Sequence, residues 1–145
     1  MEINGHLSSI LAGKGHQIWT VPPHSTVFEA LQLMADRDIG ALAVVDRGTV
    51  VGIFSERDYA RKLILHGKSS KDTEVAEVMT FPPITVSPDQ RVDDCMRLMT
   101  TKRSRHVLVM DHAELVGMVS IGDLVNWTIS AQQEAIGQLS NYIAG

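Results

Sequence analysis

Apolar residues along the chain fall into segments of helical periodicity and short continuous runs. Residues 27–34 place apolar side chains at i, i+3, i+4 and i+7, which predicts a helix with one buried face. Residues 41–45 and 50–54 are short apolar runs, typical of buried strands, and the Asp-Arg-Gly turn at 46–48 joins them. The pattern predicts a helix followed by a β-hairpin.

Further elements flank this helix and hairpin. Residues 18–21 predict a strand that ends at two prolines, which cannot donate to a strand ladder. Residues 55–65 predict a helix directly after the second hairpin strand. Shorter helices are expected at 7–11 and 75–79, with a polar connector before the latter. The order is strand, helix, strand, strand, helix.

The whole order recurs 65 residues later. When Thr20 is aligned with Thr85, the offset holds without a gap to Ile64 and Ile129, and 13 of the 45 aligned pairs are identical. A repeat of this length indicates two copies of one supersecondary unit, each too small to bury its own core. We therefore expect an α+β fold of two pseudo-symmetric β-α-β-β-α units packed sheet to sheet.

The repeat also sets the expected domain boundaries. The first unit should span 16–65 and the second 78–129, joined by the connector 66–77. Residues 1–15 form an N-terminal segment, and residues 130–145 form an amphipathic C-terminal helix. The apolar side of that helix must lie on the body or on a second subunit, and we expect a homodimer.

One heptapeptide is written twice, at 52–58 and at 117–123. Each copy closes an apolar run and opens a helix, with Ser at the turn and Asp one turn later. A helix N-terminus attracts anions, and a carboxylate can accept hydrogen bonds from two hydroxyls of one sugar, so the pattern suits a ligand with a phosphate and a ribose. Ser-x-x-Asp is also close to a capping box, which needs no ligand. The repetition favours the ligand.

Composition limits the function classes. The 145 residues are 44% hydrophobic and 21% charged, as is usual for a globular protein. A net charge of −4 argues against non-specific nucleic-acid binding. No apolar run is long enough to span a membrane, and the N-terminus lacks a secretory signal pattern. Cys95 is the single cysteine, so no intramolecular disulfide can form. We expect a cytoplasmic protein without membrane partners.

Catalytic and metal-binding patterns are missing from the sequence. The six histidines show no metal-ligand spacing, and no phosphate loop, dinucleotide fingerprint or nucleophile elbow occurs. Cys95 lies on the apolar face of a helix and is expected to be buried and inert. His106 begins a buried strand and is expected to be structural. We therefore expect neither a bound metal nor an enzyme.

The repeated unit resembles the cystathionine β-synthase (CBS) domain, and the tandem resembles a Bateman module. The resemblance covers about residues 16–129 and rests on the strand–helix order and the Gly-φ-φ-Ser-x-x-Asp ending. Three fragments resemble the small stand-alone bacterial CBS pairs: Lys14-Gly15 ahead of Trp19-Thr20-Val21, the run Ser55–Lys62, and the ending Leu139–Ile143.

The resemblance implies an adenosine-containing ligand bound in clefts between the two units. AMP or NAD is favoured, and ATP, ADP and S-adenosylmethionine stay open. Each ligand would use three kinds of group: a ribose acceptor, phosphate donors and an adenine slot. Carried over, these are Asp58 and Asp123 for ribose; Ser55, Arg57, Arg61, Ser120, Arg103 and Arg105 for phosphate; and Ile18, Trp19, Thr20, Ile84 and Thr85 for adenine.

The two expected sites carry different basic residues. Arg57 and Arg61 of the first copy correspond to Gly122 and Asn126 of the second. In the second unit, the arginines at 103 and 105 precede a buried strand instead. Guanidinium groups bind phosphate through paired donors, although arginines near a helix end can also be simply solvated. The asymmetry suggests that one site suits phosphates better than the other.

Three functions are consistent with these patterns to different degrees. The leading hypothesis is a non-catalytic sensor in which an adenine nucleotide alters an unidentified partner protein. The alternative is a constitutive homodimeric scaffold whose Ser-x-x-Asp motifs are only caps. A nucleotide hydrolase is disfavoured, because the sequence supplies neither a base nor a metal set.

Overall fold

The computed structural model describes residues 5–15 and 17–144, except for the side chains of Tyr142 and Ala144. Residues 1–4 of the expected N-terminal segment, His16 at the expected start of the first unit, and Gly145 lie outside the described residues. No helix in the described part of the chain is long and apolar enough to cross a membrane.

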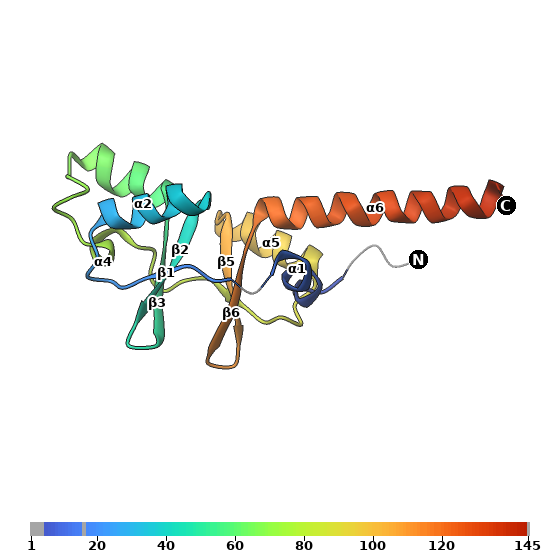
Figure 1. Ribbon diagram of the computed structural model, residues 1–145, viewed down its shortest axis with the longest axis horizontal. Coiled ribbons are helices and arrows are strands. Elements are labelled where there is room, and N and C mark those ends of the chain that lie inside the picture. Colours follow the sequence, from blue (N-terminus) through green and yellow to red (C-terminus); the bar gives the residue numbers. More distant parts are fainter. Residues whose placement is uncertain (1–4, 16, 145) are drawn as a thin grey trace. The chain divides into compact units, whose positions relative to one another are not determined.

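The chain divides into two compact units (Figure 1). The inner unit is Ile18–Pro83, and the split unit joins Met1–Gln17 to Ile84–Gly145. The inner unit contains β1 (Thr20–Val21), α2 (Val27–Arg37), β2 (Ala41–Asp46), β3 (Thr49–Ser55), α3 (Glu56–Asp58), the π-helical turn Tyr59–Leu63, the 3-10 turn Ile64–His66 and α4 (Val75–Val78). The split unit contains α1 (Leu7–Lys14), β4 (Thr85–Val86), α5 (Val92–Lys102), β5 (His106–Asp111), β6 (Glu114–Ser120) and α6 (Ile121–Ala144).

Each unit holds one three-stranded sheet, in the order β1-β2-β3 or β4-β5-β6. The first pair of strands is parallel and the second pair antiparallel. Thr20 pairs with Ala43, and 65 residues later Thr85 pairs with Leu108. The ladders shift register after Val44 and again after Val109, at the same offset. The predicted α+β fold with a duplicated unit is confirmed.

The buried face of each unit's first helix follows the periodicity of the sequence. Val27, Ala30 and Met34 of α2 are buried in the core of the inner unit, and Thr26 Oγ1 accepts the Glu29 N–H at 3.1 Å. Cys95 of α5 is buried in the core of the split unit. Burial raises the pKa of its thiol. A buried protonated thiol packs as a small apolar group.

A short helix completes each core. The sequence predicts both helices but does not indicate which core each one joins. Leu7 and Ile10 of α1 are buried in the split unit, and Val75 and Val78 of α4 are buried in the inner unit. The backbone docking is equivalent: Leu7 N–H donates to the Gln90 carbonyl at 2.9 Å, and Val75 N–H donates to the Ser25 carbonyl at 2.8 Å. These helices are related by an offset of 68 residues, not 65.

Two glycines permit this docking. A Cβ on Gly117 would lie 2.5 Å from Leu11 Cδ2, and a Cβ on Gly52 would lie 2.6 Å from Met79 Sδ. Leu11 and Met79 are themselves 68 residues apart. The glycine that opens each repeated heptapeptide therefore serves the close approach of a helix that precedes the other repeat in sequence.

Several elements differ in extent from the sequence expectation. The first strand is Thr20–Val21, because Pro22 ends the ladder, and α1 continues to Lys14. The helix expected at 55–65 is divided into α3 and two irregular turns. Within this stretch Leu63 is buried, and Lys62 forms an i,i+4 ion pair with Asp58. Residues 130–144 are not a separate helix but continue α6, because no proline or positive-φ glycine interrupts the chain between Ile121 and Ala144.

Candidate functional site

The two Ser-x-x-Asp segments form the first turn of α3 and of α6. We name them the Asp58 turn (Ser55–Asp58) and the Asp123 turn (Ser120–Asp123). In the Asp58 turn, Ser55 N–H donates to Asp58 Oδ2 at 3.0 Å, and Asp58 N–H donates to Ser55 Oγ at 3.2 Å. The Asp123 turn repeats both bonds at 2.9 and 3.1 Å. Each Asp is therefore part of a capping box, as the alternative interpretation requires.

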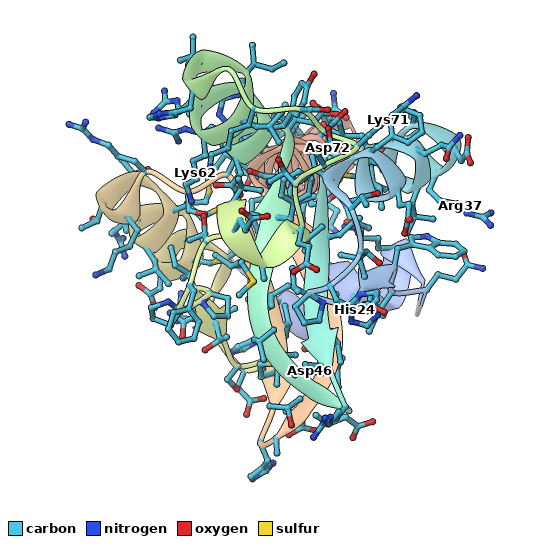
Figure 2. All side chains as sticks on the ribbon, turned by 90° about the vertical axis from the view of Figure 1, so that its left-hand side faces the viewer. His24, Arg37, Asp46, Lys62, Lys71 and Asp72 are labelled. Atoms are coloured by element: carbon cyan, nitrogen blue, oxygen red, sulfur yellow. The ribbon has the colours of Figure 1, made fainter. Side chains whose placement is uncertain are left out.

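In the Asp58 turn both carboxylate oxygens have protein partners. Oδ1 accepts from Thr80 Oγ1 at 2.9 Å and lies 3.0 Å from Lys62 Nζ, while Oδ2 also accepts from Ser55 Oγ at 3.0 Å. Thr80 is fixed by two backbone hydrogen bonds with Ile53, of 2.8 and 3.1 Å. The Asp58 side chain is only 8% exposed. Figure 2 shows Lys62 at the end of the inner unit opposite to Asp46, which lies toward the hairpin turn.

The Asp123 turn is more open. Lys14 Nζ donates to Asp123 Oδ2 at 2.7 Å and to the Met118 carbonyl at 2.8 Å. At the 68-residue offset, Ala12 takes the place of Thr80 and has no hydroxyl to donate. Among the described residues, every hydrogen bond to the Asp123 side chain reaches Oδ2, and the side chain is 26% exposed. Oδ1 of Asp123 can therefore accept a further hydrogen bond.

The charge state of Asp123 follows from its surroundings. Burial by itself would raise the pKa of this carboxyl, but the hydrogen bond from Lys14, the Ser120 N–H and the positive charge of Lys14 lower it. The net effect is a pKa below the ordinary value for Asp. At neutral pH this side chain is ionised and accepts hydrogen bonds without donating any.

Replacing Lys14 with glutamine is expected to raise the pKa of Asp123, because the variant loses the positive charge and the strongest hydrogen bond. An Asp with a lowered folded pKa stabilises the fold above its unfolded pKa of about 3.9, and this contribution is lost as the pH falls through the folded pKa. The free energy of unfolding of Lys14→Gln should therefore fall less steeply in acid than that of the native chain. Carboxyl NMR titration and urea unfolding at several pH values measure both effects. Lys102→Gln, which removes an exposed lysine from the same unit, is the control, and an unchanged Asp123 pKa in Lys14→Gln would contradict the assignment.

The arginines expected to bind phosphate differ in position. The Arg105 carbonyl accepts the Ile121 N–H at 2.9 Å, so the backbone of Arg105 adjoins the Asp123 turn, and its side chain is exposed. The equivalent partner at the Asp58 turn is Gly40, whose carbonyl accepts from Glu56 at 3.1 Å. Arg103 is exposed at the C-terminus of α5 with a φ of 53°. The structure thus brings one arginine of the second unit directly beside the repeated motif.

Arg57 and Arg61 lie near the other turn. Arg57 is half-buried in α3, within the Asp58 turn itself, and has interaction partners. Arg61 is exposed one turn later. Arg57 thus lies within the Asp58 turn, whereas the backbone of Arg105 adjoins the Asp123 turn.

The residues expected to contact adenine lie at the first strand of each sheet. Thr20 is exposed and pairs with Ala43, which in turn pairs with Ile53 across the sheet. Ile53 lies two residues before Ser55, so Thr20 is close to the end of the sheet that carries the Asp58 turn. Because β1 runs parallel to β2, the half-buried Ile18 and Trp19 precede Thr20 toward the end of the sheet where the Asp58 turn lies.

In the split unit the arrangement repeats. Thr85 is exposed and pairs with Leu108, which pairs with Met118, two residues before Ser120. Ile84 is half-buried, and its carbonyl accepts the Leu108 N–H. The inner unit adds a contact that the split unit lacks in sequence: the Arg37 guanidinium lies 4.0 Å from the centre of the Trp19 ring. Figure 2 shows Arg37 at the side of the inner unit, away from Lys62. The Arg37 guanidinium thus covers one face of the Trp19 ring in a cation–π contact.

Three residues at these turns were not expected to be functional: Lys14, Lys62 and Thr80. All three bond the repeated aspartates. Lys14 and Thr80 come from the segments around α1 and α4, which lie outside the gapless 65-residue alignment that begins at Thr20 and Thr85. The 68-residue match between Leu7-x-x-Ile10-Leu11 and Val75-x-x-Val78-Met79 is the sequence signal that could have identified these segments. In the described part of the chain, no three His, Cys, Asp or Glu side chains are grouped as metal ligands.

Comparison with known proteins identifies the repeated unit. The family model of the CBS domain matches residues 15–65 and 75–130. The CBS domain-containing protein CBSX3, mitochondrial, of Arabidopsis thaliana is 38% identical over 96% of this chain and 72% of its own length.

Solved structures agree. A structure from Burkholderia ambifaria, described as a candidate signal-transduction protein with CBS domains, is 46% identical with a TM-score of 0.83, covering 86% of this chain and 94% of the other. A hexameric CBS-CP12 protein from bloom-forming cyanobacteria is 27% identical with a TM-score of 0.75, covering 83% of this chain and 70% of the other. Two matches of the family model, on the two copies of one sheet-and-helix unit, show that this chain belongs to the CBS-domain family as a tandem CBS pair.

Proposed function

We propose that this chain is a non-catalytic regulatory module that binds an adenine nucleotide and thereby alters a partner protein. CBS-domain proteins are commonly regulatory or sensor modules. The observation that carries the proposal is the Asp123 turn, where an ionised, partly exposed carboxylate stands at the start of a 24-residue helix, with one oxygen to which no described residue donates. AMP or NAD is the favoured ligand, and ATP, ADP and S-adenosylmethionine share the same adenosine.

The chemistry of the Asp123 turn suits a ribose phosphate. Oδ1 of Asp123 can accept from a ribose hydroxyl while Oδ2 stays bonded to Lys14 and Ser120. Lys14, which is bonded to Asp123, and Arg105, whose backbone adjoins the turn, supply two cationic side chains for a phosphate. The N–H groups of Ile121 and Asp123 are already bonded to the Arg105 carbonyl and to Ser120 Oγ, so the phosphate would depend on these side chains. Ser120 caps the same helix and can donate its hydroxyl hydrogen to a phosphate oxygen.

The Asp58 turn is the weaker candidate for the same ligand. A ribose hydroxyl there must replace Thr80 or Lys62 on a carboxylate that is already fully partnered. Losing those bonds costs free energy that the ligand has to offset. We therefore assign the tighter nucleotide binding to the split unit, with Thr85 and Ile84 at the adenine side.

A second function, a homodimeric scaffold without nucleotide dependence, is favoured by one observation. Both aspartates already close capping boxes within the chain, so their presence is explained without a ligand. Self-association is part of both proposals. The hexameric CBS-CP12 relative supports it, and so do the exposed apolar residues of α6.

The two functions differ in their response to nucleotides. AMP, ADP, ATP, NAD and S-adenosylmethionine are tested separately for a rise in the melting temperature Tm. A ligand that binds only the folded chain adds about 2.7 kcal/mol at 100 times its Kd, which corresponds to a rise of about 5–10 °C for a chain of this size. Ribose 5-phosphate and adenine, tested alone, show whether both halves of the ligand are needed. An unchanged Tm with all five ligands would reject the sensor proposal in favour of the scaffold.

A further inference from the structure

The C-terminal helix α6 exposes a row of large apolar side chains. They are Val125, Ile129, Ile136, Leu139 and Ile143, with Ile136 64% exposed and Ile143 76% exposed. Among the described residues from Ser130 onward, none is buried. In Figure 1 the C-terminal part of α6 extends beyond α1 and α5 of its own unit. The split unit therefore leaves this row uncovered.

The spacing of the row is that of a coiled coil. The positions 125, 129, 132, 136, 139 and 143 advance by four and three residues in turn, which is the a/d heptad pattern. Ile129, Ile136 and Ile143 occupy a positions, and Val125 and Leu139 occupy d positions. Gln132 takes the remaining d position. A helix that only packs on its own domain shows a wider apolar face of period 3.6 instead.

Charge favours an identical partner for this row. Over its 24 residues α6 carries two charged side chains, Asp123 and Glu134. Glu134 falls at the f position, on the side opposite to the row, and no charged residue occupies an e or g position beside it. Two copies of the helix can therefore approach without repulsion between like charges. A solitary helix end of this length is marginal in water without a packing partner.

We propose that residues 125–143 of α6, the α6 seam, bind the same seam of a second copy as a parallel two-stranded coiled coil. Isoleucine occupies all three a positions, and this β-branched residue at a, with Leu139 at d, favours two strands in a parallel coiled coil. In the aligned pair, Gln132 faces Gln132 of the second copy, and the two amides can hydrogen-bond to each other. A shift by one heptad would place each amide against apolar side chains without a partner, so Gln132 fixes the register. This proposal names the surface for the self-association proposed above, and it does not depend on nucleotide binding.

The test compares two glutamate substitutions on opposite sides of α6. Light scattering after gel filtration and analytical ultracentrifugation give the mass and the dimer Kd. Leu139→Glu places two negative charges within the seam, so its dimer Kd should rise roughly 30-fold or more, the loss typical of an interface hot spot. Asn141→Glu adds the same charge at an f position and should keep the native Kd. A monomeric native chain, or a Leu139→Glu variant as dimeric as Asn141→Glu, would overturn the proposal.

Two further measurements keep the result specific. The nucleotide Tm shift of Leu139→Glu should match that of the native chain, and its circular dichroism should lose no more than the helix signal of the unpaired end of α6. These two results separate loss of the seam from loss of the fold or of ligand binding. Ile143→Cys should form a disulfide between chains in air, because position 143 meets itself only in a parallel, aligned pair. The native chain is the control, since its one cysteine, Cys95, is buried. A dimer of Ile143→Cys that never cross-links would reject the parallel arrangement.

Discussion

Replacing Leu7 with alanine is expected to lower the free energy of unfolding by about 2–5 kcal/mol, the range for a buried leucine whose removal leaves a cavity. Leu7 lies near the N-terminus, yet it is completely buried in the core of the split unit. Its N–H is also bonded to the Gln90 carbonyl. The second CBS domain therefore depends on residues that precede the first.

Tryptophan fluorescence can assign this loss to the correct unit. Trp19 packs against the core of the inner unit and Trp127 against the core of the split unit. In a Trp19→Phe background, urea unfolding followed by Trp127 should show the full effect of Leu7→Ala. Ser9→Ala, at an exposed position of the same helix, should leave the transition within about 0.5 kcal/mol, as is usual for surface substitutions. A Leu7→Ala loss as small as that of Ser9→Ala would mean that α1 does not belong to this core.

Local patterns predicted the repeated unit well because its contacts are close in sequence. The hairpins and the buried face of α2 follow from apolar runs, helical periodicity and turn residues that are close in sequence, and the 65-residue offset follows from the identities among 45 aligned pairs. The matching registers of Thr20 and Thr85 confirm the repeat at the level of hydrogen bonds. The placement of α1 could not be predicted in this way, because it packs on residues about 80 positions away and shows the same periodicity wherever it packs.

The candidate site was predictable to a similar extent. The Ser-x-x-Asp motifs indicate both turns, since the capping bonds join residues three apart. Lys14 and Thr80 reach the aspartates from segments whose offset is 68, so they fall outside the 65-residue alignment. The difference between the two turns arises from Thr80 and Lys62, which both bond Asp58. Their counterparts at the Asp123 turn are Ala12, at the 68-residue offset, and Trp127, at the 65-residue offset. One of these two differences therefore comes from a distant segment and the other from the helix itself.

Asp123→Ala is expected to weaken binding of AMP or NAD by roughly 10- to 150-fold, which corresponds to the loss of a hydrogen bond to a charged group, about 1.5–3 kcal/mol. Asp58→Ala should weaken binding less, because that carboxylate already serves Thr80 and Lys62. For the free energy of unfolding, we expect the opposite order, with the larger loss in Asp58→Ala. Asp58→Ala leaves these two groups without their shared acceptor, so its unfolding free energy should fall by more than the ~0.5–2 kcal/mol of a lost cap. Titration calorimetry and urea unfolding of both variants measure the two orders.

Asp123→Asn can distinguish helix capping from ligand binding, because asparagine has the same shape as aspartate but an uncharged amide in place of the carboxylate. The amide oxygen of asparagine can still accept the Ser120 N–H, so the variant can keep the capping bond and should keep most of its stability. It loses the negative charge that pairs with Lys14, and its amide nitrogen donates where a ribose hydroxyl also donates. If Asp123 binds ribose, Asp123→Asn should therefore bind nucleotide nearly as poorly as Asp123→Ala while unfolding close to the native chain. Native affinity in Asp123→Asn, with lost stability in Asp123→Ala, would instead assign the carboxylate to the helix cap, and the duplicated motif would then be a folding device in both units.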